Sequence, residues 1–314
     1  MSTRSASGYI KKKPNLVNTF VRDWQLWVMI IPAIIIIFVF QYIPMYGIQL
    51  AFRKYTFKTG ITGGEWVGLK YFAQFFSVPN GVELILNTMR IAILSMVTGF
   101  PCPIIIALIF NQVRSERRKR VLQTTVYMPN FISTVVLVSM LNIFFNYDGI
   151  FTQGMKNLGL WDQAYNPLGD PKAFLPMYLL SNIWSGAGWG SIIYLAALSN
   201  VDRELYDACK IDGATRLQTM WHVDIPCIIP TIVMLMILNA GGILGVGFEK
   251  INLMTNALNQ AETNVIATYT YAIGLGSHQY SYAAAIGVFN MVVSFTMTYI
   301  VNFIAAHLGE TSLW

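Results

Sequence analysis

The chain has 314 residues, of which 55% are hydrophobic and only 11% are charged, and its formal net charge is +6. This composition lies far outside that of soluble globular domains, so we expect an all-α integral membrane protein. Its three cysteines, Cys102, Cys209 and Cys227, cannot supply a disulfide framework and show no metal-binding spacing.

Residues 1–25 form a polar segment with five basic side chains. These are Arg4, Lys11, Lys12, Lys13 and Arg22. The segment has no apolar stretch ahead of a small-residue cleavage site, so we do not expect a removable signal peptide. We interpret it as a cytoplasmic tail. A basic amphipathic helix on the membrane surface is the alternative, which Gly8 and Pro14 disfavour.

Six apolar runs follow, each near the roughly 20 residues that a membrane-spanning helix needs. They are approximately Leu26–Ala51, Leu84–Asn111, Val121–Phe145, Leu175–Leu198, Pro226–Phe248 and Ser281–Leu308. We therefore take residues 26–308 as the transmembrane domain and residues 309–314 as a second tail. Six crossings place both chain ends on the same side of the membrane.

Basic residues are unevenly divided between the two sets of loops. The amino-terminal tail has five, residues 112–120 have five, the loop around Asp212 has three, and the other three loops have seven together. Because cytoplasmic loops carry an excess of Lys and Arg, both termini and the Asp212 loop are predicted to be cytoplasmic. We interpret the basic cluster at 114–120 as a signal that sets the orientation of the chain in the membrane, next to anionic lipid. No nucleic-acid partner is therefore predicted.

Charged side chains are nearly absent inside the apolar runs, where Arg90 lies close enough to the outer face to reach water. We predict that a set of amide and indole side chains lines a substrate path. The set is Asn142, Asn146, Asn182, Trp184, Trp189, Asn239 and Asn290. Amides pair with hydroxyls and aromatic rings stack on sugars, so an uncharged path favours a neutral, hydroxyl-rich solute. Hydrogen bonding between helices is the alternative role for each residue.

Two further patterns, in an outer loop and among the glycines, indicate function or packing less specifically. The predicted outer loop 249–280 has four asparagines among its tyrosines and is expected to form a vestibule for a polar ligand, or merely a solvated loop. The pairs Gly186/Gly190 and Gly241/Gly245 have the four-residue spacing that lets helices approach closely.

Residues 200–226, here called the polar loop, are the one charged segment in the second half of the chain. A first helix is predicted over Val201–Ile211, with Ser199 and Asp202 at its start and Gly213 as a left-handed stop. A second helix is predicted to begin with a capping box.

That capping box pairs Thr215 with Gln218, and it places Leu217, Met220 and Trp221 on one apolar face. The loop has five acidic and three basic residues, whereas helices that lie on lipid are usually rich in Lys and Arg. A protein is therefore the favoured partner of the apolar face.

Three short motifs in the polar loop resemble the EAA loop of the membrane subunits of binding-protein-dependent ABC importers. They are Asp207-Ala208-Cys209, Asp212-Gly213-Ala214 and Ile225-Pro226, with Asp207 in place of the usual Glu and Cys209 in place of the second Ala. The resemblance covers about residues 83–303 and implies a six-helix type I permease bundle. The segments 186–202, 246–254 and 280–290 resemble more narrowly the sugar permeases that handle oligosaccharides and polysaccharide fragments.

The resemblance implies that the polar loop docks into a cleft on an ATPase subunit. The docking residues would be Asp207, Ala208, Asp212, Gly213, Ala214, Arg216 and Trp221. It also implies two ATPase subunits, a related but different second permease subunit, an external solute-binding protein, a carbohydrate substrate and a bacterial cytoplasmic membrane. The chain has no P-loop, so it is expected to bind no cofactor itself, and ATP and Mg²⁺ would be bound by the ATPase subunits.

Two other functions remain open from the sequence. An ion-coupled secondary carrier would place Asp, Glu or His at midplane depth, where this chain has none. A membrane adaptor without transport explains the polar loop but not the polar groups within the spans. No enzyme is predicted, because His222, His278 and His307 are scattered and Ser191 is not in a nucleophile elbow.

Overall fold

The computed structural model describes residues 22, 24–161, 165–242 and 244–307. Most of the predicted amino-terminal tail and all of the carboxyl tail lie outside these residues. The described part is helical, with two isolated β-bridges and no strand, which confirms the all-α prediction. Five of its helical segments are long and apolar enough to span a membrane: Trp24–Phe52, Gly81–Asn111, Thr134–Asn157, Arg216–Gly241 and Tyr280–His307.

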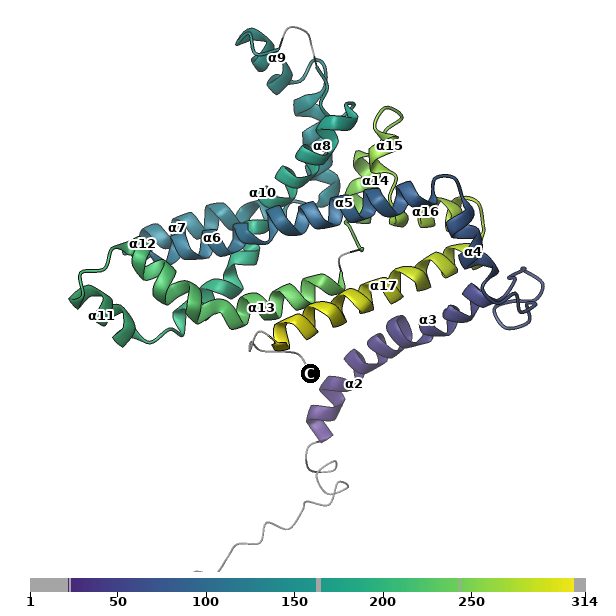
Figure 1. The fold of residues 1–314 in the computed structure, drawn as a ribbon, viewed down its shortest axis with the longest axis horizontal. Coiled ribbons are helices and arrows are strands. Elements are labelled where there is room, and N and C mark those ends of the chain that lie inside the picture. The colour runs from purple at the N-terminus through teal and green to yellow at the C-terminus, as the bar shows by residue number, and fades with distance from the viewer. Residues whose placement is uncertain (1–21, 23, 162–164, 243, 308–314) are drawn as a thin grey trace, which may run out of the picture.

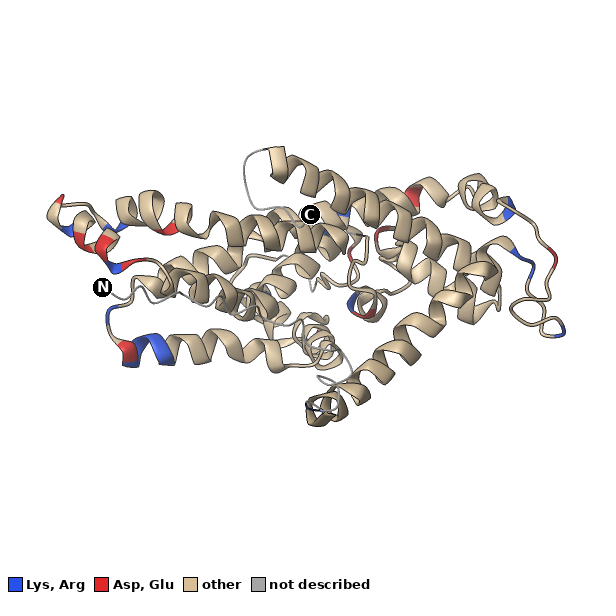
Figure 2. Cartoon of the chain, turned by 90° about the horizontal axis from the view of Figure 1, so that it is seen from below, with Lys and Arg blue, Asp and Glu red and all other residues tan. Residues whose placement is uncertain are grey.

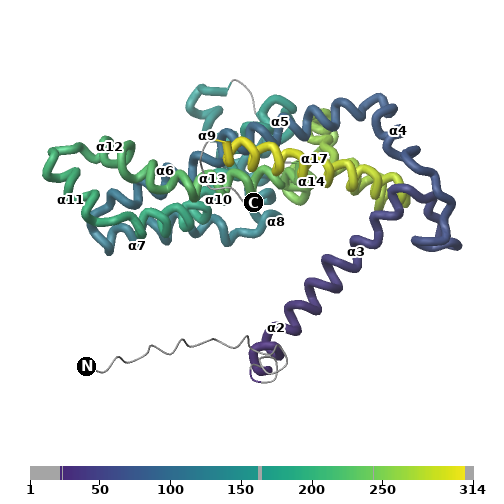
Figure 3. The backbone as a smooth tube through the Cα atoms, turned by 60° about the horizontal axis from the view of Figure 1, so that its bottom comes forward, coloured from purple at the N-terminus to yellow at the C-terminus, as the bar shows by residue number. Residues whose placement is uncertain are grey.

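The first span stands apart from the others. It consists of α2 (Trp24–Ile37), the π turn η1 (Phe38–Tyr42), α3 (Ile43–Met45) and the 3-10 turn η2 (Tyr46–Phe52). Its most apolar window has no buried residue, and Figure 3 shows it as an arm directed away from the bundle. Only η2 packs along α17 (Tyr280–His307), so the arm leaves a long apolar surface for lipid or another protein.

The bundle is built around α10 (Pro171–Ser199). It packs along α5 (Gly81–Gly99) and α6 (Pro101–Asn111), which together form the second span, and it also contacts α7 (Glu116–Tyr127) and α13 (Ile225–Gly241). In turn α13 packs against α17. Figure 1 shows α7, α11 and α12 at one end of this bundle and α4 at the other, and Figure 2 shows charged residues at both ends, with a smaller group between them.

Small residues let α10 approach its neighbours closely. A Cβ atom on Gly188 would lie 2.1 Å from the backbone oxygen of Val126 in α7, and one on Gly190 would lie 3.1 Å from Cγ of Pro103 in α6. Gly186, in contrast, faces open space. The close contact therefore involves Gly188 and Gly190, and not the predicted pair Gly186/Gly190.

Two of the predicted spans are organised differently. The run Val121–Phe145 is divided, because α7 ends at Tyr127 and α8 (Thr134–Phe145) begins after the 3-10 turn η3 (Met128–Phe131). Ser133 caps the new helix by accepting a hydrogen bond from the N–H of Val136. The run Leu175–Leu198 lies within the 29 residues of α10, but it is not among the five spans that meet the hydropathy criterion. Its Ser, Gly and Asn residues suit a helix packed on several sides by protein.

The fifth predicted run ends early. The helix α13 stops at Gly241, and Gly245 donates its N–H to the carbonyl of Gly242 in a turn. The predicted pair Gly241/Gly245 therefore does not lie on one helix. The sixth run is confirmed to within one residue over its described part by α17.

The segments predicted to be outer loops contain short helices: α4 (Lys70–Ser77), α9 (Ile150–Asn157), α14 (Phe248–Met254), α15 (Gln260–Thr263), α16 (Ile266–Tyr271) and the π turn η5 (Ala272–Gly276). Asn256 and Asn259 belong to the loop 249–280, for which a vestibule or a solvated loop was predicted. Instead both amides donate to the carbonyl of Leu168, at 2.8 and 2.9 Å, and Asn259 is fully buried. These side chains hold two outer loops together. Arg90 pairs with Glu262 of α15 at 2.6 Å, consistent with its predicted reach toward the outer face.

The close packing at Gly188 gives a testable prediction. Gly188→Ala should lower the free energy of unfolding by about 1–3 kcal/mol, because its Cβ would force α10 away from the backbone of α7. Gly186→Ala is the matched control, since the added methyl group meets nothing within 4 Å. Thermal unfolding of both variants in the same detergent measures the difference. Equal melting temperatures would show that this helix contact is not tightly packed.

Candidate functional site

The first helix of the polar loop, α11 (Arg203–Ile211), begins two residues later than predicted. Asp202 alone caps it, by accepting a hydrogen bond from the N–H of Glu204 at 3.0 Å. Ser199 takes no part, because its hydroxyl donates to the carbonyl of Leu195 inside α10. The predicted left-handed stop is confirmed, since Gly213 has φ of +70° and the N–H of Ala214 donates back into α11.

The second helix of the polar loop is the start of a membrane span. The capping box is confirmed: the N–H of Thr215 donates to Oε1 of Gln218 at 2.7 Å, and the N–H of Gln218 donates back to the Thr215 hydroxyl. From there α12 (Arg216–Thr219), the π turn η4 (Met220–Asp224) and α13 run on without a break to Gly241. A displacement of the polar loop would thus act directly on a spanning helix.

The polar loop exposes several large apolar side chains. The side chains of Leu205, Ile211, Leu217 and Trp221 are 44%, 85%, 67% and 67% exposed. Met220 was predicted to lie on the same apolar face as Leu217 and Trp221. Instead it packs inward against a core cluster formed by α6, α10 and α13. The π turn that begins at Met220 changes the helical spacing at this point. The remaining apolar side chains form a surface that another protein could cover.

The predicted docking residues lie in the same loop as these apolar side chains, and Trp221 belongs to both sets. Asp207, Ala208, Asp212, Gly213, Arg216 and Trp221 are exposed, and Ala214 is half-buried. Asp207 forms an exposed ion pair with Lys210 at 2.7 Å, and the hydrogen bond from Lys210 lowers the pKa of Asp207. A hollow of about 290 Å³ lies between the two short helices and includes Asp212, Gly213 and Ala214 in its wall.

A buried carboxylate fixes the polar loop to the bundle. Asp224 is fully buried, and its oxygens accept hydrogen bonds from the Tyr206 hydroxyl at 2.6 Å, the Asn111 amide at 3.2 Å and the Gln112 amide at 3.1 Å. It thereby joins α11, the end of α6 and the start of α13. Burial and the bond to Asp224 raise the pKa of Tyr206 to about 12, so the phenol remains a donor at neutral pH.

Asp224 was counted in the sequence only as one of five acids in the loop. The signal that could have singled it out is its place at the entrance to an apolar run, two residues before Pro226. A charged residue at such a position needs partners within the protein.

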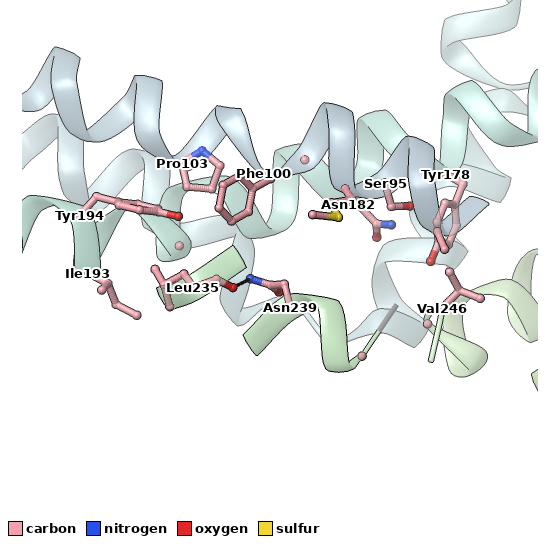
Figure 4. A pocket seen from close by; sticks show the side chains of 16 residues that line it. Ser95, Phe100, Pro103, Tyr178, Asn182, Ile193, Tyr194, Leu235, Asn239 and Val246 are labelled. Carbon is pink, nitrogen blue, oxygen red and sulfur yellow. Dashed lines mark hydrogen bonds between the residues drawn. The ribbon is translucent and has the colours of Figure 1, made fainter. Parts of the chain in front are cut away.

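A central cavity of about 460 Å³ lies between α5, α6, α10, α13 and the turn that follows α13 (Figure 4). Two of the predicted path residues, Asn182 and Asn239, line it. Ser95, Tyr178 and Tyr194 add hydroxyl groups to the wall. The cavity can therefore offer hydrogen bonds to a polar solute on an otherwise apolar surface.

The other five predicted path residues lie outside this cavity. Asn142 donates to the backbone of its own helix, and Asn146 accepts the N–H of the next residue at the end of α8. Trp184 lines a separate apolar hollow of about 320 Å³ between α8 and α10. Trp189 is 48% exposed and packs edge-to-face on a phenyl ring of η3. Asn290 has a buried carbonyl oxygen without a partner in the described residues.

Lys250 was counted in the sequence as an ordinary basic residue of an outer loop. In the structure it lies in α14 and is 6% exposed, its ammonium group donates to Oδ1 of Asn182 at 2.7 Å, and it stands 5.4 Å from the centre of the Tyr178 ring. Lys250 does not itself line the cavity, whose described lining residues are uncharged, but its ammonium group lies directly behind Asn182 of the wall.

The chain matches the family model described as "Binding-protein-dependent transport system inner membrane component" over residues 99–309. It is similar to the polygalacturonan/rhamnogalacturonan transport system permease protein YteP of Bacillus subtilis, with 39% identity over 307 residues that cover 97% of this chain and 94% of YteP. It is also 38% identical to protein LplB of the same organism over 93% of this chain and 92% of LplB.

Two solved structures share the fold. One is a bacterial ABC transporter involved in the import of the acidic polysaccharide alginate, with a TM-score of 0.84 and 36% identity over 93% of this chain and 98% of the other. The second is a bacterial alginate ABC transporter in complex with a periplasmic protein bound to an alginate pentasaccharide. Its TM-score is 0.85, with 36% identity over 95% of this chain and 99% of the other.

The buried carboxylate can be tested by stability. Asp224→Ala should lower the free energy of unfolding by about 3 kcal/mol, because each buried donor left without a partner costs about 1–3 kcal/mol. Tyr206→Phe removes one donor only and should cost about 1 kcal/mol. Asp148→Ala, at an exposed aspartate far from the polar loop, is the control. Chemical or thermal unfolding in detergent ranks the three variants, and an Asp224→Ala variant as stable as the control would contradict a structural role for this carboxylate.

Proposed function

This chain belongs to the family of binding-protein-dependent transport system inner membrane components, and we propose that it is the permease subunit of an ABC importer for an oligosaccharide or polysaccharide fragment. The observation that carries this proposal is the 36–39% identity, over nearly the whole chain, to the polygalacturonan/rhamnogalacturonan permease YteP, to protein LplB and to bacterial alginate transporters. The hydroxyl and amide groups of the central cavity support a carbohydrate cargo.

The energy for transport is proposed to come from two ATPase subunits that bind ATP and Mg²⁺. The polar loop would dock on them through Asp207, Ala208, Asp212, Gly213, Ala214, Arg216 and Trp221. Its exposed apolar side chains would fill a cleft on the ATPase, and the charged ones would form ion pairs at the rim.

The proposed mechanism follows from one helix. The segment Arg216–Gly241 begins in the polar loop and reaches the cavity with Asn239 near its other end. When ATP draws the two ATPase subunits together, a shift of the polar loop would turn or tilt this helix. Asp224 would transmit the same shift to α6 through Asn111 and Gln112. The cavity wall would thereby change its shape with the nucleotide cycle.

The remaining partners are proposed from the surface of the chain. The exposed apolar arm Trp24–Phe52 would face lipid and a second, related permease subunit. A solute-binding protein would deliver cargo at the end that carries α4. The excess of Lys and Arg in the amino-terminal tail, residues 112–120 and the polar loop supports a cytoplasmic position for both termini and the polar loop in a bacterial membrane.

Two glycines in the same backbone conformation allow a matched docking test. Gly213 and Gly159 both have φ of +70°, both end a short helix with the same pair of backbone hydrogen bonds, and neither has an atom within 4 Å of an added Cβ. They lie at opposite sides of the predicted membrane. Strain from a side chain should therefore be similar at the two positions.

We expect Gly213→Arg to yield a folded membrane protein that no longer binds the ATPase subunits, because the long side chain would occupy the docking surface. Gly159→Arg should retain ATPase binding. Co-purification of the ATPase with each tagged variant is the measurement. Equal ATPase recovery from both variants would contradict docking at the polar loop.

The transport function itself is tested with the complete importer in proteoliposomes. Uptake of a labelled oligosaccharide should require ATP inside the vesicle, should be lost when the ATPase is omitted, and should be unaffected by an ionophore. Uptake that continues without ATP and stops with the ionophore would instead establish an ion-coupled carrier. No uptake of any solute, despite bound ATPase, would favour an adaptor.

A further inference from the structure

We propose that the central cavity selects anionic sugars, those that carry carboxylate groups, and that Lys250 is the residue that provides this selectivity. The inference rests on the proposed function, since it specifies the class of carbohydrate that the permease passes. It goes beyond the fold and the polar loop because it concerns one buried ammonium group and the hydrogen-bond donors around it.

The first observation is a buried positive charge without a counter-charge. Lys250 is 6% exposed, and its ammonium group makes one hydrogen bond, to the neutral amide oxygen of Asn182. The ion pairs found among the described residues are Arg90–Glu262 and Lys210–Asp207, neither of which involves Lys250. Its sequence neighbour Glu249 is exposed. A buried charge costs several kcal/mol unless it is paired, so such a residue marks a functional site.

The second observation is the chemistry of the cavity wall beside Lys250. The oxygen of the Asn182 side chain accepts from the ammonium group and its amide also bonds to Tyr178, so one N–H of the amide remains for a ligand. The Ser95 hydroxyl is buried in the same wall and has no partner in the described residues. Figure 4 shows Ser95, Asn182 and Tyr178 together at one end of the cavity. This end presents donors, backed by a positive charge.

The third observation is that the wall contains no opposing negative charge. Among the described residues that line the cavity there is no Asp or Glu. A carboxylate on the sugar would accept from the amide and hydroxyl donors and would supply the missing counter-charge to Lys250. A neutral sugar of the same shape could accept the same hydrogen bonds but would leave the ammonium group unpaired. The difference in uptake between a charged sugar and a neutral sugar of the same shape therefore measures the contribution of Lys250.

The experiment uses the complete importer in proteoliposomes with two matched probes, tetragalacturonate and its fully methyl-esterified form. The two probes share the sugar backbone and differ in charge. Uptake rates are compared for the unaltered permease and for Lys250→Gln, Lys250→Arg and Asn182→Asp. Each variant is compared with the unaltered permease on the same probe, so the preference of the solute-binding protein cancels.

We expect Lys250→Gln to reduce uptake of the charged probe by roughly tenfold or more, the order expected for one partly screened ion pair, and to leave the ester unchanged. Lys250→Arg should retain the preference for charge. Asn182→Asp should lose it although Lys250 is present, because the new carboxylate would neutralise the ammonium group at 2.7 Å.

Several outcomes would overturn the inference. An equal loss of uptake for both probes would assign Lys250 a purely structural role. So would an unchanged ratio of the two uptake rates in Lys250→Gln and Asn182→Asp. If Lys250→Gln does not fold, Asn182→Asp alone decides, because it preserves the buried contact. Uptake of the ester but not of tetragalacturonate by the unaltered permease would disprove anionic selectivity and leave carbohydrate import intact. Uptake of neither probe or of any other oligosaccharide would instead contradict the proposed function.

Discussion

The contact on which the rest of the structure depends is the buried carboxylate of Asp224. It gathers a phenol from the polar loop and two amides from the end of α6 around the first turn of α13. Without it, α11 would be connected to the bundle only through its chain ends and the exposed caps of a short loop. With it, the position of α11 is tied to two spanning helices at once. A buried charge with all its partners is rigid, because each partner would lose a strong hydrogen bond on moving alone.

The second half of the architecture is the close packing around α10. Because Gly188 and Gly190 have no side chains, α10 lies directly against the backbone of α7 and the ring of Pro103. The wall of the central cavity includes both Gly190 and Pro103, together with residues of α5, of α13 and of the turn that follows α13. The same helix, α10, therefore both packs closely on its neighbours and lines the cavity.

The sequence predicted the local features and missed those that depend on distant partners. The stop at Gly213, the capping box at Thr215 and the limits of α17 could be predicted, because their causes lie within a few residues. The roles of Asp224 and Lys250 could not. Their partners are 112 and 68 residues away, for Gln112 and Asn182 respectively, and only the fold brings them together. The run Leu175–Leu198 was predicted as a span, and it lies within the single helix α10, whose polar residues suit contact with neighbouring helices.

The arm Trp24–Phe52 has a consequence for how such a protein is assembled. Neither the cavity nor the polar loop includes any of its residues, and its apolar window buries nothing within the chain. The central cavity and the polar loop are therefore built without the arm. What the arm contributes is a long apolar surface that the described part of the chain leaves uncovered, so that within a membrane it is available to lipid or to a second protein.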